Sequence, residues 1–461
     1  MSLRKQIIAT IIILTIIFGI SIRWINLGQK VYWYDEVVPT LRVVGYGWRE
    51  TQEIMTRNVF MTAEELQDFQ TFSKGKNWDQ IFILNEQIEH PPLYFAFQRL
   101  IALIFGPSPT VFRIASVVFS LLTFPALAWL CWELFEDLSV SGIAPALFAV
   151  SPIQVAYAQE AKPYSYLVLS VLLSSAMLIS ATKHKKSILW GTYGISLAFT
   201  LYSSLLAVLY LFAHGIWMTF RRQRSREDLY RFWLAVALGI GLYSPWLYRV
   251  LSRWDTIQYA TQWTRQPIEL RKLVISWVSG WAHSILDLGY NPQVQSVGLF
   301  INSIVCFFLL TIVLTATIFS KTVNKRAIRF CLLLSLFPFG IMILRDLISH
   351  GRATTAARYY LPSISILLID LSHMCSSGED EVDGSFSGGQ QIPGIQGTLQ
   401  PFIPEDQLTA ADREALALVD DILSKYEESE DQRLLSEGID PEEIPTIDLG
   451  QVVVIELNPN D

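Results

Sequence analysis

The sequence predicts an all-α polytopic membrane protein, and three observations support this fold class. Hydrophobic residues make up 51% of the chain and its mean hydropathy is +0.35, both above the range usual for soluble proteins. The apolar residues fall in long blocks, several of them near the length of about 20 residues that a helix needs to cross a hydrocarbon core. Several of the loops between these blocks are rich in lysine and arginine, as the cytoplasmic loops of multi-pass proteins are.

The first apolar block runs from Gln6 to Ile25 and follows Arg4-Lys5, which predicts a span with a cytoplasmic N-terminus. A cleaved signal peptide would begin similarly, but its apolar core is shorter, about 7–15 residues, and ends in small residues. This block instead ends in Arg23-Trp24, which is typical of an interfacial anchor. Further spans bring the predicted number to about ten: Thr110–Leu134, Gly142–Tyr157, Tyr164–Ala181, Ile188–Tyr202, Leu205–Phe220, Phe232–Val250, Val297–Phe319, Phe330–Leu344 and Tyr359–His373.

A polar and aromatic segment, residues 27–110, separates the first two spans and predicts a large outer loop with interfacial helices. Its block Pro92–Phe105 is only 14 residues long and contains Gln98 and Arg99, which favours an interfacial position over a crossing. With that block at the interface, three basic loops lie on the cytoplasmic side with the N-terminus, whereas a crossing would place all three outside. These loops are Lys183–Lys186, Arg221–Arg231 and Lys321–Arg329.

The charge of the chain differs between residues 1–375 and residues 376–461. The 42 acidic residues divide equally, 21 to each region, whereas only three of the 35 basic residues lie in the second region. The first region therefore carries a net charge of +11 and the second −18. The second region predicts an acidic, mostly flexible cytoplasmic tail, with the pattern of an amphipathic helix at 410–426 and of a strand at 452–457. Its charge argues against binding to nucleic acid or anionic lipid.

The predicted topology brings polar residues from separate segments to one outer face of the membrane. They are Asp35-Glu36, Glu89-His90, Arg113, Glu160 with Lys162, and Arg345–Arg358. Carboxylates can deprotonate an acceptor hydroxyl, and an interfacial arginine can bind a lipid phosphate. Plainer interpretations remain open for each motif: Asp35 as the cap of a helix that begins near Val37, Arg113 as an interfacial side chain, and Glu160 with Lys162 as a surface ion pair.

The order and spacing of these motifs resemble those of protein O-mannosyltransferases and lipid A aminoarabinose transferases. These family 39-like glycosyltransferases share the GT-C membrane fold and use polyprenyl-phosphate sugars. The resemblance covers residues 5–375 and rests on Asp35-Glu36, His90-Pro91-Pro92-Leu93-Tyr94, Phe112-Arg113, Ser151-Pro152 leading to Tyr157–Tyr164, and Arg358–Pro362. It implies that a hexosyl or pentosyl group moves from a polyprenyl-phosphate donor to a hydroxyl of a protein, lipid or polysaccharide. The reaction would take place on the extracytoplasmic face of the plasma (inner) membrane.

The resemblance also implies roles for individual residues. Asp35 is the expected catalytic base and Glu36 its support. Lys162 stands where related sequences commonly have arginine, so the charge is kept but the bidentate fork is lost. The residues expected to bind donor or acceptor are Glu89, His90, Arg113, Glu160, Lys162, Arg358 and Tyr359.

No metal is assigned, because the chain has no Asp-x-Asp motif, although Asp35, Glu36 and Glu160 together offer oxygen ligands for one divalent cation. The tryptophan-rich outer loop Leu251–Ser296 is expected either to cover the site or to form an interfacial aromatic belt. Two other classes of function remain open, a transporter or flippase of lipid-linked sugars and a non-catalytic lipid-binding protein. The position of the polar candidates in loops, away from the membrane midplane, argues against transport.

Overall fold

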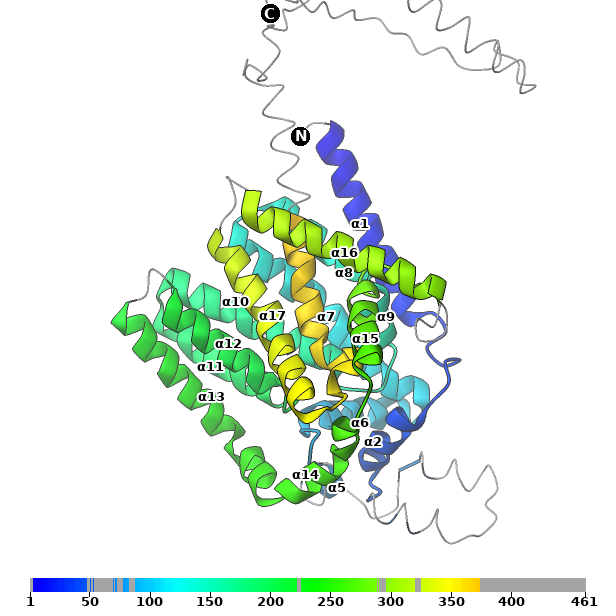
Figure 1. The fold of residues 1–461 in the computed structure, drawn as a ribbon. Coiled ribbons are helices and arrows are strands. Elements are labelled where there is room, and N and C mark those ends of the chain that lie inside the picture. The colour runs from blue at the N-terminus through cyan, green and yellow to red at the C-terminus, as the bar shows by residue number, and fades with distance from the viewer. Residues whose placement is uncertain are drawn as a thin grey trace, which may run out of the picture. The chain divides into compact units, whose positions relative to one another are not determined.

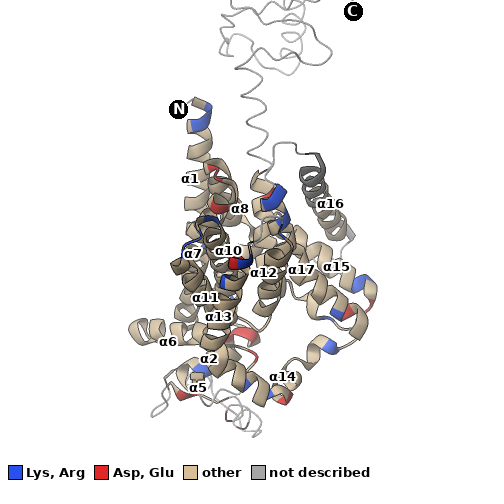
Figure 2. Ribbon diagram, turned by 90° about the vertical axis from the view of Figure 1, so that its left-hand side faces the viewer, with Lys and Arg blue, Asp and Glu red and all other residues tan. Residues whose placement is uncertain are grey.

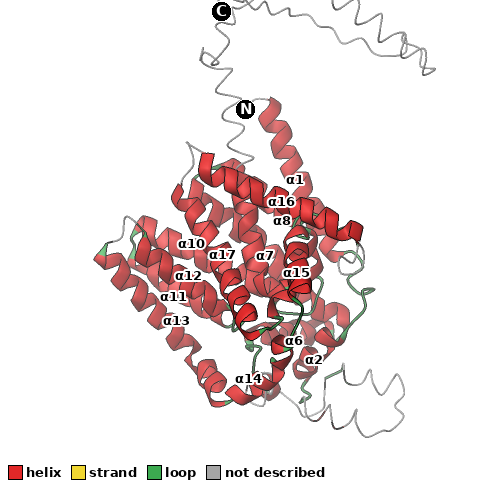
Figure 3. Ribbon diagram, in the orientation of Figure 1, coloured by secondary structure: helices red, strands yellow, loops and turns green. Residues whose placement is uncertain are grey.

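The structure is a computed structural model that describes residues 3–47, 50, 53, 69, 71–72, 78–82, 88–221, 225–287, 289, 296–319 and 325–373. The chain divides into two compact units, Met1–Ser377 and Gly378–Asp461, and all described residues belong to the first. The predicted acidic tail, with its patterns at 410–426 and 452–457, lies outside the described residues. Within them every regular element is a helix (Figure 3), so the all-α prediction is confirmed.

The helices include several that are long and apolar enough to cross a membrane, which makes the protein an integral membrane protein. Five meet this condition among the described residues: α1 (Leu3–Trp24), α7 (Pro109–Phe135), α10 (Tyr164–His184), α13 (Arg226–Ser252) and α17 (Lys325–Ser349). Shorter apolar helices are α6 (Leu93–Phe105), α11 (Ser187–Leu201), α12 (Ala207–Phe220) and the 297–308 part of α16 (Ser296–Phe319). Each of the predicted spans is helical over most of its length. The last consists of η3 (Ala357–Tyr360) and a helix over 361–373. The number of spans stays a prediction.

One predicted span, Gly142–Tyr157, is not a single helix. It is divided into α8 (Leu138–Val150) and α9 (Pro152–Ala158), which meet at an angle of 66°. Ser151 between them is extended, with φ −63° and ψ 116°, because a residue before proline is disfavoured in the helical region. Pro152 then begins the second helix at a position where its missing N–H is not needed. The predicted span is therefore built from two helices, and its crossing of the membrane stays a prediction.

Arg23 connects this break to the first span. Its side chain is fully buried, and its Nη atoms donate to the carbonyl oxygens of Phe148 (3.1 Å) and Ala149 (2.7 Å) in the last turn of α8. These carbonyls lie at a helix end, where no later N–H of the same helix can reach them. Gly19 allows the approach, since a Cβ there would lie 2.4 Å from Ala149 Cβ. The expectation that Arg23 is an interfacial anchor is therefore corrected.

The helices that build the site lie at one end of the bundle. Figures 1 and 2 show α2 (Tyr34–Val44), α5 (Asp79–Phe82), α6 and α14 (Trp254–Ala260) at the end opposite the N-terminus of α1. Helix α6 lies across the bundle in Figure 2, with Leu103, Ile104 and Phe105 exposed while Gln98 and Arg99 are buried. An apolar exposed side on a short helix agrees with the predicted interfacial position. The remaining elements are η1 (Gln262–Arg265), α15 (Leu270–Ala282) and η2 (Ala353–Thr355).

Candidate active site

A fully buried ion pair joins Glu36 in the first turn of α2 to Arg113 in the first turns of α7. The pair is bidentate, with Nε to Oε1 at 2.8 Å and Nη2 to Oε2 at 2.7 Å. Arg113 also donates to the carbonyl oxygens of Leu27, Lys30 and Val31 at 2.7, 2.9 and 2.9 Å. All five of its N–H donors are therefore used inside the protein. Arg113 could bind a lipid phosphate, as the sequence led us to expect, only by releasing these partners.

The same pair fixes the loop between α9 and α10. Glu36 Oε1 accepts a hydrogen bond from the backbone N–H of Ala161 at 2.8 Å. Ser116 on α7 donates to the carbonyl oxygen of Lys162 at 2.9 Å, and the Gln159 side chain donates to the carbonyl of Ile22 at 2.9 Å. The loop that carries Lys162 is thus held by α1, α2 and α7 together. Glu36 therefore links α7 to the loop that carries Lys162.

Asp35 precedes Glu36 but faces different partners. Successive residues of a helix point about 100° apart, so the two carboxylates diverge. Helix α2 begins at Tyr34, with Trp33 as its N-cap, so Asp35 lies inside the first turn and is not the cap of a helix that begins near Val37. Its Oδ2 accepts a hydrogen bond of 2.9 Å from Nη1 of Arg358. The two side chains are 24% and 19% exposed, so this ion pair is open to solvent where the Glu36 pair is closed.

Arg358 lies in η3 and is surrounded by aromatic rings. Its guanidinium carbon is 5.9 Å from the ring centre of Tyr164, 5.8 Å from that of Trp263 and 5.6 Å from that of Tyr359. Cation–π contacts of this kind stabilise a cation without fixing the direction of its hydrogen bonds. The structure therefore brings Arg358 and Tyr359, both predicted site residues, to Asp35 across 323 positions of sequence.

Lys162 is the second cation near Asp35. Its side chain is 5% exposed and interacts electrostatically with Asp35, Arg358, Glu160 and Glu89. Burial lowers the pKa of Lys162 to about 8, with the cation Arg358 acting in the same direction and the three carboxylates opposing it. No hydrogen bond from Nζ occurs within the described residues. A buried ammonium group that makes no hydrogen bond is suited to an incoming anion whose oxygens can accept one.

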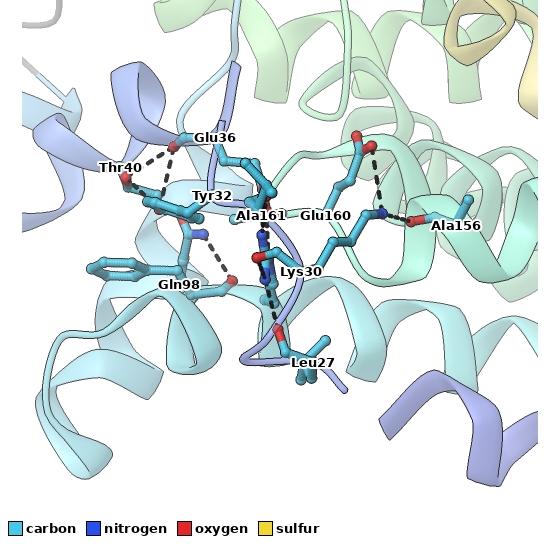
Figure 4. A network of polar contacts seen from close by, with 12 residues as sticks. Leu27, Lys30, Tyr32, Glu36, Thr40, Gln98, Ala156, Glu160 and Ala161 are labelled. Atoms are coloured by element: carbon cyan, nitrogen blue, oxygen red, sulfur yellow. Dashed lines mark hydrogen bonds and ion pairs between the residues drawn. The ribbon is translucent and has the colours of Figure 1, made fainter. Parts of the chain in front are cut away.

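Glu160 turns toward a different partner, Lys30. Lys30 Nζ lies 3.9 Å from Glu160 Oε1 and donates to the carbonyl oxygen of Ala156 at 3.3 Å (Figure 4). Glu160 Oε2 is buried and has no hydrogen-bond partner among the residues that the structure describes. Burial raises the pKa of Glu160, and the cation Lys30 opposes this shift. The alternative that Glu160 and Lys162 form a surface ion pair does not fit this arrangement.

Glu89 and His90 interact electrostatically with Lys162. The carbonyl oxygen of His90 accepts hydrogen bonds from both Nη atoms of Arg42 at 3.2 Å, and that guanidinium lies 3.7 Å from the ring centre of Phe95. Burial lowers the pKa of His90 well below its ordinary value, and the cations Lys162 and Arg42 add to the shift, so the ring is neutral near pH 7. Burial raises the pKa of Glu89. His90 is therefore suited to hydrogen bonding and not to charge pairing.

The acidic residues do not form a cation site in this arrangement. Both oxygens of Glu36 accept hydrogen bonds from Arg113, and Asp35 is paired with Arg358. In the described ranges no group of three or more His, Cys, Asp or Glu side chains is placed to hold a metal ion. The ligand set Asp35, Glu36 and Glu160 therefore does not fit a divalent cation.

Some residues of the site had no clear signal in the sequence. Tyr164 appeared only as part of a longer motif, yet its ring lies beside Arg358 and packs edge-on against Tyr157 at 5.3 Å. Trp263 was one of several tryptophans of an outer loop, and it is the one that faces Arg358 and Tyr359. Trp281 of the same loop instead packs against Phe339 of α17. Within the loop Leu251–Ser296, the η1 segment is therefore a part that lies against Arg358.

The sequence comparisons agree with the resemblance inferred from the motifs. Residues 89–248, roughly a third of the chain, match the model of the dolichyl-phosphate-mannose-protein mannosyltransferase family. The matched segment contains His90, Arg113, Glu160 and Lys162. No curated protein sequence matches the chain significantly. The expected resemblance is confirmed over the matched residues.

Two solved structures with a similar course of the chain are distant in sequence. The oligosaccharyltransferase of Archaeoglobus fulgidus, tethered to an acceptor peptide, has a TM-score of 0.49 at 11% identity and covers 83% of this chain. This chain spans 51% of that structure, about half its length. ArnT from Cupriavidus metallidurans, bound to undecaprenyl phosphate, has a TM-score of 0.40 at 10% identity, with 83% of this chain and 81% of that chain covered.

Proposed function

We propose that the protein is a GT-C-type membrane glycosyltransferase that moves a sugar from a polyprenyl-phosphate donor to an acceptor hydroxyl. The observation that carries this proposal is the grouping of one partly exposed carboxylate, Asp35, with two cations, Arg358 and Lys162. Such a grouping offers a base for the acceptor and a positive site for a phosphate leaving group. The match of residues 89–248 to a mannosyltransferase family supports the same reaction class.

In the proposed reaction the acceptor oxygen attacks the anomeric carbon of the donor sugar. The bond between that carbon and the phosphate oxygen breaks, and Asp35 accepts the acceptor's hydroxyl proton. Arg358 and Lys162 stabilise the negative charge that develops on the leaving polyprenyl phosphate. Glu36 and Arg113 take no direct part and hold the loop that carries Lys162. We assign to the neutral ring of His90 a hydrogen bond with the donor or the acceptor.

The proposed site faces the extracytoplasmic side of the plasma membrane. The three basic loops Lys183–Lys186, Arg221–Arg231 and Lys321–Arg329 support this orientation, because basic loops remain cytoplasmic. The donor enters from the bilayer, and the acceptor, a protein, lipid or polysaccharide, arrives from outside.

The test compares lipid extracts of cells that produce the wild-type protein, the Asp35→Asn variant at equal amount, or no protein. Mass spectrometry should detect a polyprenyl-phosphate sugar that accumulates in the last two and not in the first, and its mass identifies the sugar. If only cells without the protein accumulate the lipid, the donor class stands and the assignment of Asp35 fails. Absence of any accumulating lipid in cells without the protein would contradict the proposed function.

A further inference from the structure

Arg358 uses only part of its hydrogen-bonding capacity. Nη1 donates to Asp35, whereas Nε is buried and has no hydrogen-bond partner within the described part of the chain. Arg113, in contrast, directs every donor to a protein oxygen. A buried guanidinium N–H without a partner costs free energy, so Arg358 gains from a ligand that offers more acceptor oxygens than one carboxylate atom.

The surroundings of Arg358 allow it to turn while its backbone stays fixed. The three rings of Tyr164, Trp263 and Tyr359 lie at similar distances from the cation, between 5.6 and 5.9 Å, and these ring contacts do not fix its orientation. The directional contacts of the guanidinium are the hydrogen bond to Asp35 and one with the Tyr359 side chain. The backbone beneath is anchored, because the N–H of Arg352 donates to the carbonyl of Thr264 at 2.8 Å.

The beginning of the same segment is anchored by Asp346, which is buried. Asp346 Oδ2 accepts hydrogen bonds from both the N–H and the hydroxyl of Thr354 at 2.7 Å, and that hydroxyl accepts from Trp277 Nε1 at 2.7 Å. These bonds fix η2 and the turn into η3. A change of partner at Arg358 therefore requires only side-chain rotation.

We propose, building on the proposed function, that Arg358 is a cation shared between Asp35 and the donor phosphate. Without donor it pairs with Asp35, and the phosphate group of a polyprenyl-phosphate sugar takes it over. Phosphate oxygens accept several charge-assisted hydrogen bonds from a guanidinium, and Lys162 offers a second positive charge at the same place. The release leaves the Asp35 carboxylate free for the acceptor hydroxyl, so the base loses its cationic partner only when donor is bound.

The test measures binding of undecaprenyl phosphate, the sugar-free probe, to the full chain in nanodiscs. If Asp35 competes for Arg358, Asp35→Asn should bind the probe more tightly, by about three- to tenfold, because a partly exposed ion pair is no longer broken. Arg358→Gln should bind it more weakly. In the Arg358→Gln background Asp35→Asn should bring no further gain, because the competition is absent. Arg358→Met, which also removes the charge and suits the surrounding rings, replaces Arg358→Gln if the latter does not fold.

Glu160→Gln is the matched control. It also removes one negative charge beside Lys162, but its carboxylate pairs with Lys30. Glu160 interacts with Arg358 only through charge and without a hydrogen bond, so its effect on affinity should depend on Arg358 much less than that of Asp35→Asn. If the Asp35→Asn gain persists in the Arg358→Gln background, simple charge removal explains it and the shared cation is contradicted. Failure of the proposed function looks different: the wild-type protein then binds no undecaprenyl phosphate, which removes both proposals.

Discussion

The two neighbouring carboxylates at the start of α2 each meet an arginine, and the two pairs differ in almost every physical respect. Glu36 and Arg113 are both 0% exposed, bind through two parallel hydrogen bonds and leave no donor of the arginine unused. Asp35 and Arg358 are 24% and 19% exposed and share one hydrogen bond. A closed, saturated pair can only stabilise structure, whereas an open one can exchange partners. The comparison assigns support to the first pair and chemistry to the second.

The largest expected effect follows from breaking the closed pair. Glu36→Gln leaves the Arg113 guanidinium buried without its counter-charge, and removal of one partner of such a pair costs about 3–5 kcal/mol of folding free energy. Thermal unfolding in detergent should therefore show a large fall in Tm. Glu160→Gln is the control, because its carboxylate has no bidentate partner in the described structure and its Tm should stay close to that of the wild type. Equal Tm values for both variants would remove the distinction between the pairs.

The second largest effect concerns Lys162, the other cation near the solvent-exposed Asp35–Arg358 pair. Lys162→Met should weaken the binding of undecaprenyl phosphate by about 10- to 100-fold at pH 7, since a charge-assisted contact to phosphate is lost. The pH dependence gives an independent check. The lysine binds phosphate as a cation, and its pKa is lowered to about 8, so wild-type affinity should fall as the pH rises through 8. Lys162→Arg should keep its affinity up to pH 9, and a wild-type affinity independent of pH between 7 and 9 would contradict the role of Lys162.

The smallest effect concerns the ring that covers Arg358. Trp263→Ala removes one cation–π contact, worth about 0.5–1 kcal/mol, and should weaken phosphate binding about two- to fivefold. Trp263→Phe keeps a ring and should remain nearer to the wild type. Trp281→Ala provides the comparison within the same outer loop, because Trp281 packs against Phe339 and Tyr360 and not against the Arg358 cation. An equal loss for Trp263→Ala and Trp281→Ala would indicate a general loop effect.

The sequence predicted the helical segments well, because the length and apolar character of a segment are local properties. The break at Ser151-Pro152 was not predicted, although the restriction that proline imposes on the preceding residue is visible in the sequence. The role of Arg23 was missed for a different reason. Its acceptor carbonyls at Phe148 and Ala149 exist only because that helix ends there.

The candidate site was predicted as a set of residues and not as a set of partners. Motif spacing identified Asp35, Glu36, Arg113 and Arg358, but nothing in it indicates which arginine meets which carboxylate. Those pairings join residues 77 and 323 positions apart and depend on how α2, α7 and η3 pack. An interfacial position was a reasonable interpretation for a basic residue at the start of a helix. Arg113 instead donates hydrogen bonds to carbonyl oxygens of the 27–31 segment, which packs around it, and this packing could not be read from the sequence.

The most direct test of the account is the turnover of Asp35→Asn compared with its stability. The lipid that accumulates in cells without the protein serves as donor for purified protein in vesicles, and release of polyprenyl phosphate is measured beside thermal unfolding. The account predicts a loss of about 10²–10⁴-fold in turnover, the usual contribution of a general base, with a Tm close to that of the wild type. A variant that turns over within threefold of the wild type, or one that loses activity only because it unfolds, would contradict the assignment of chemistry to the Asp35 pair.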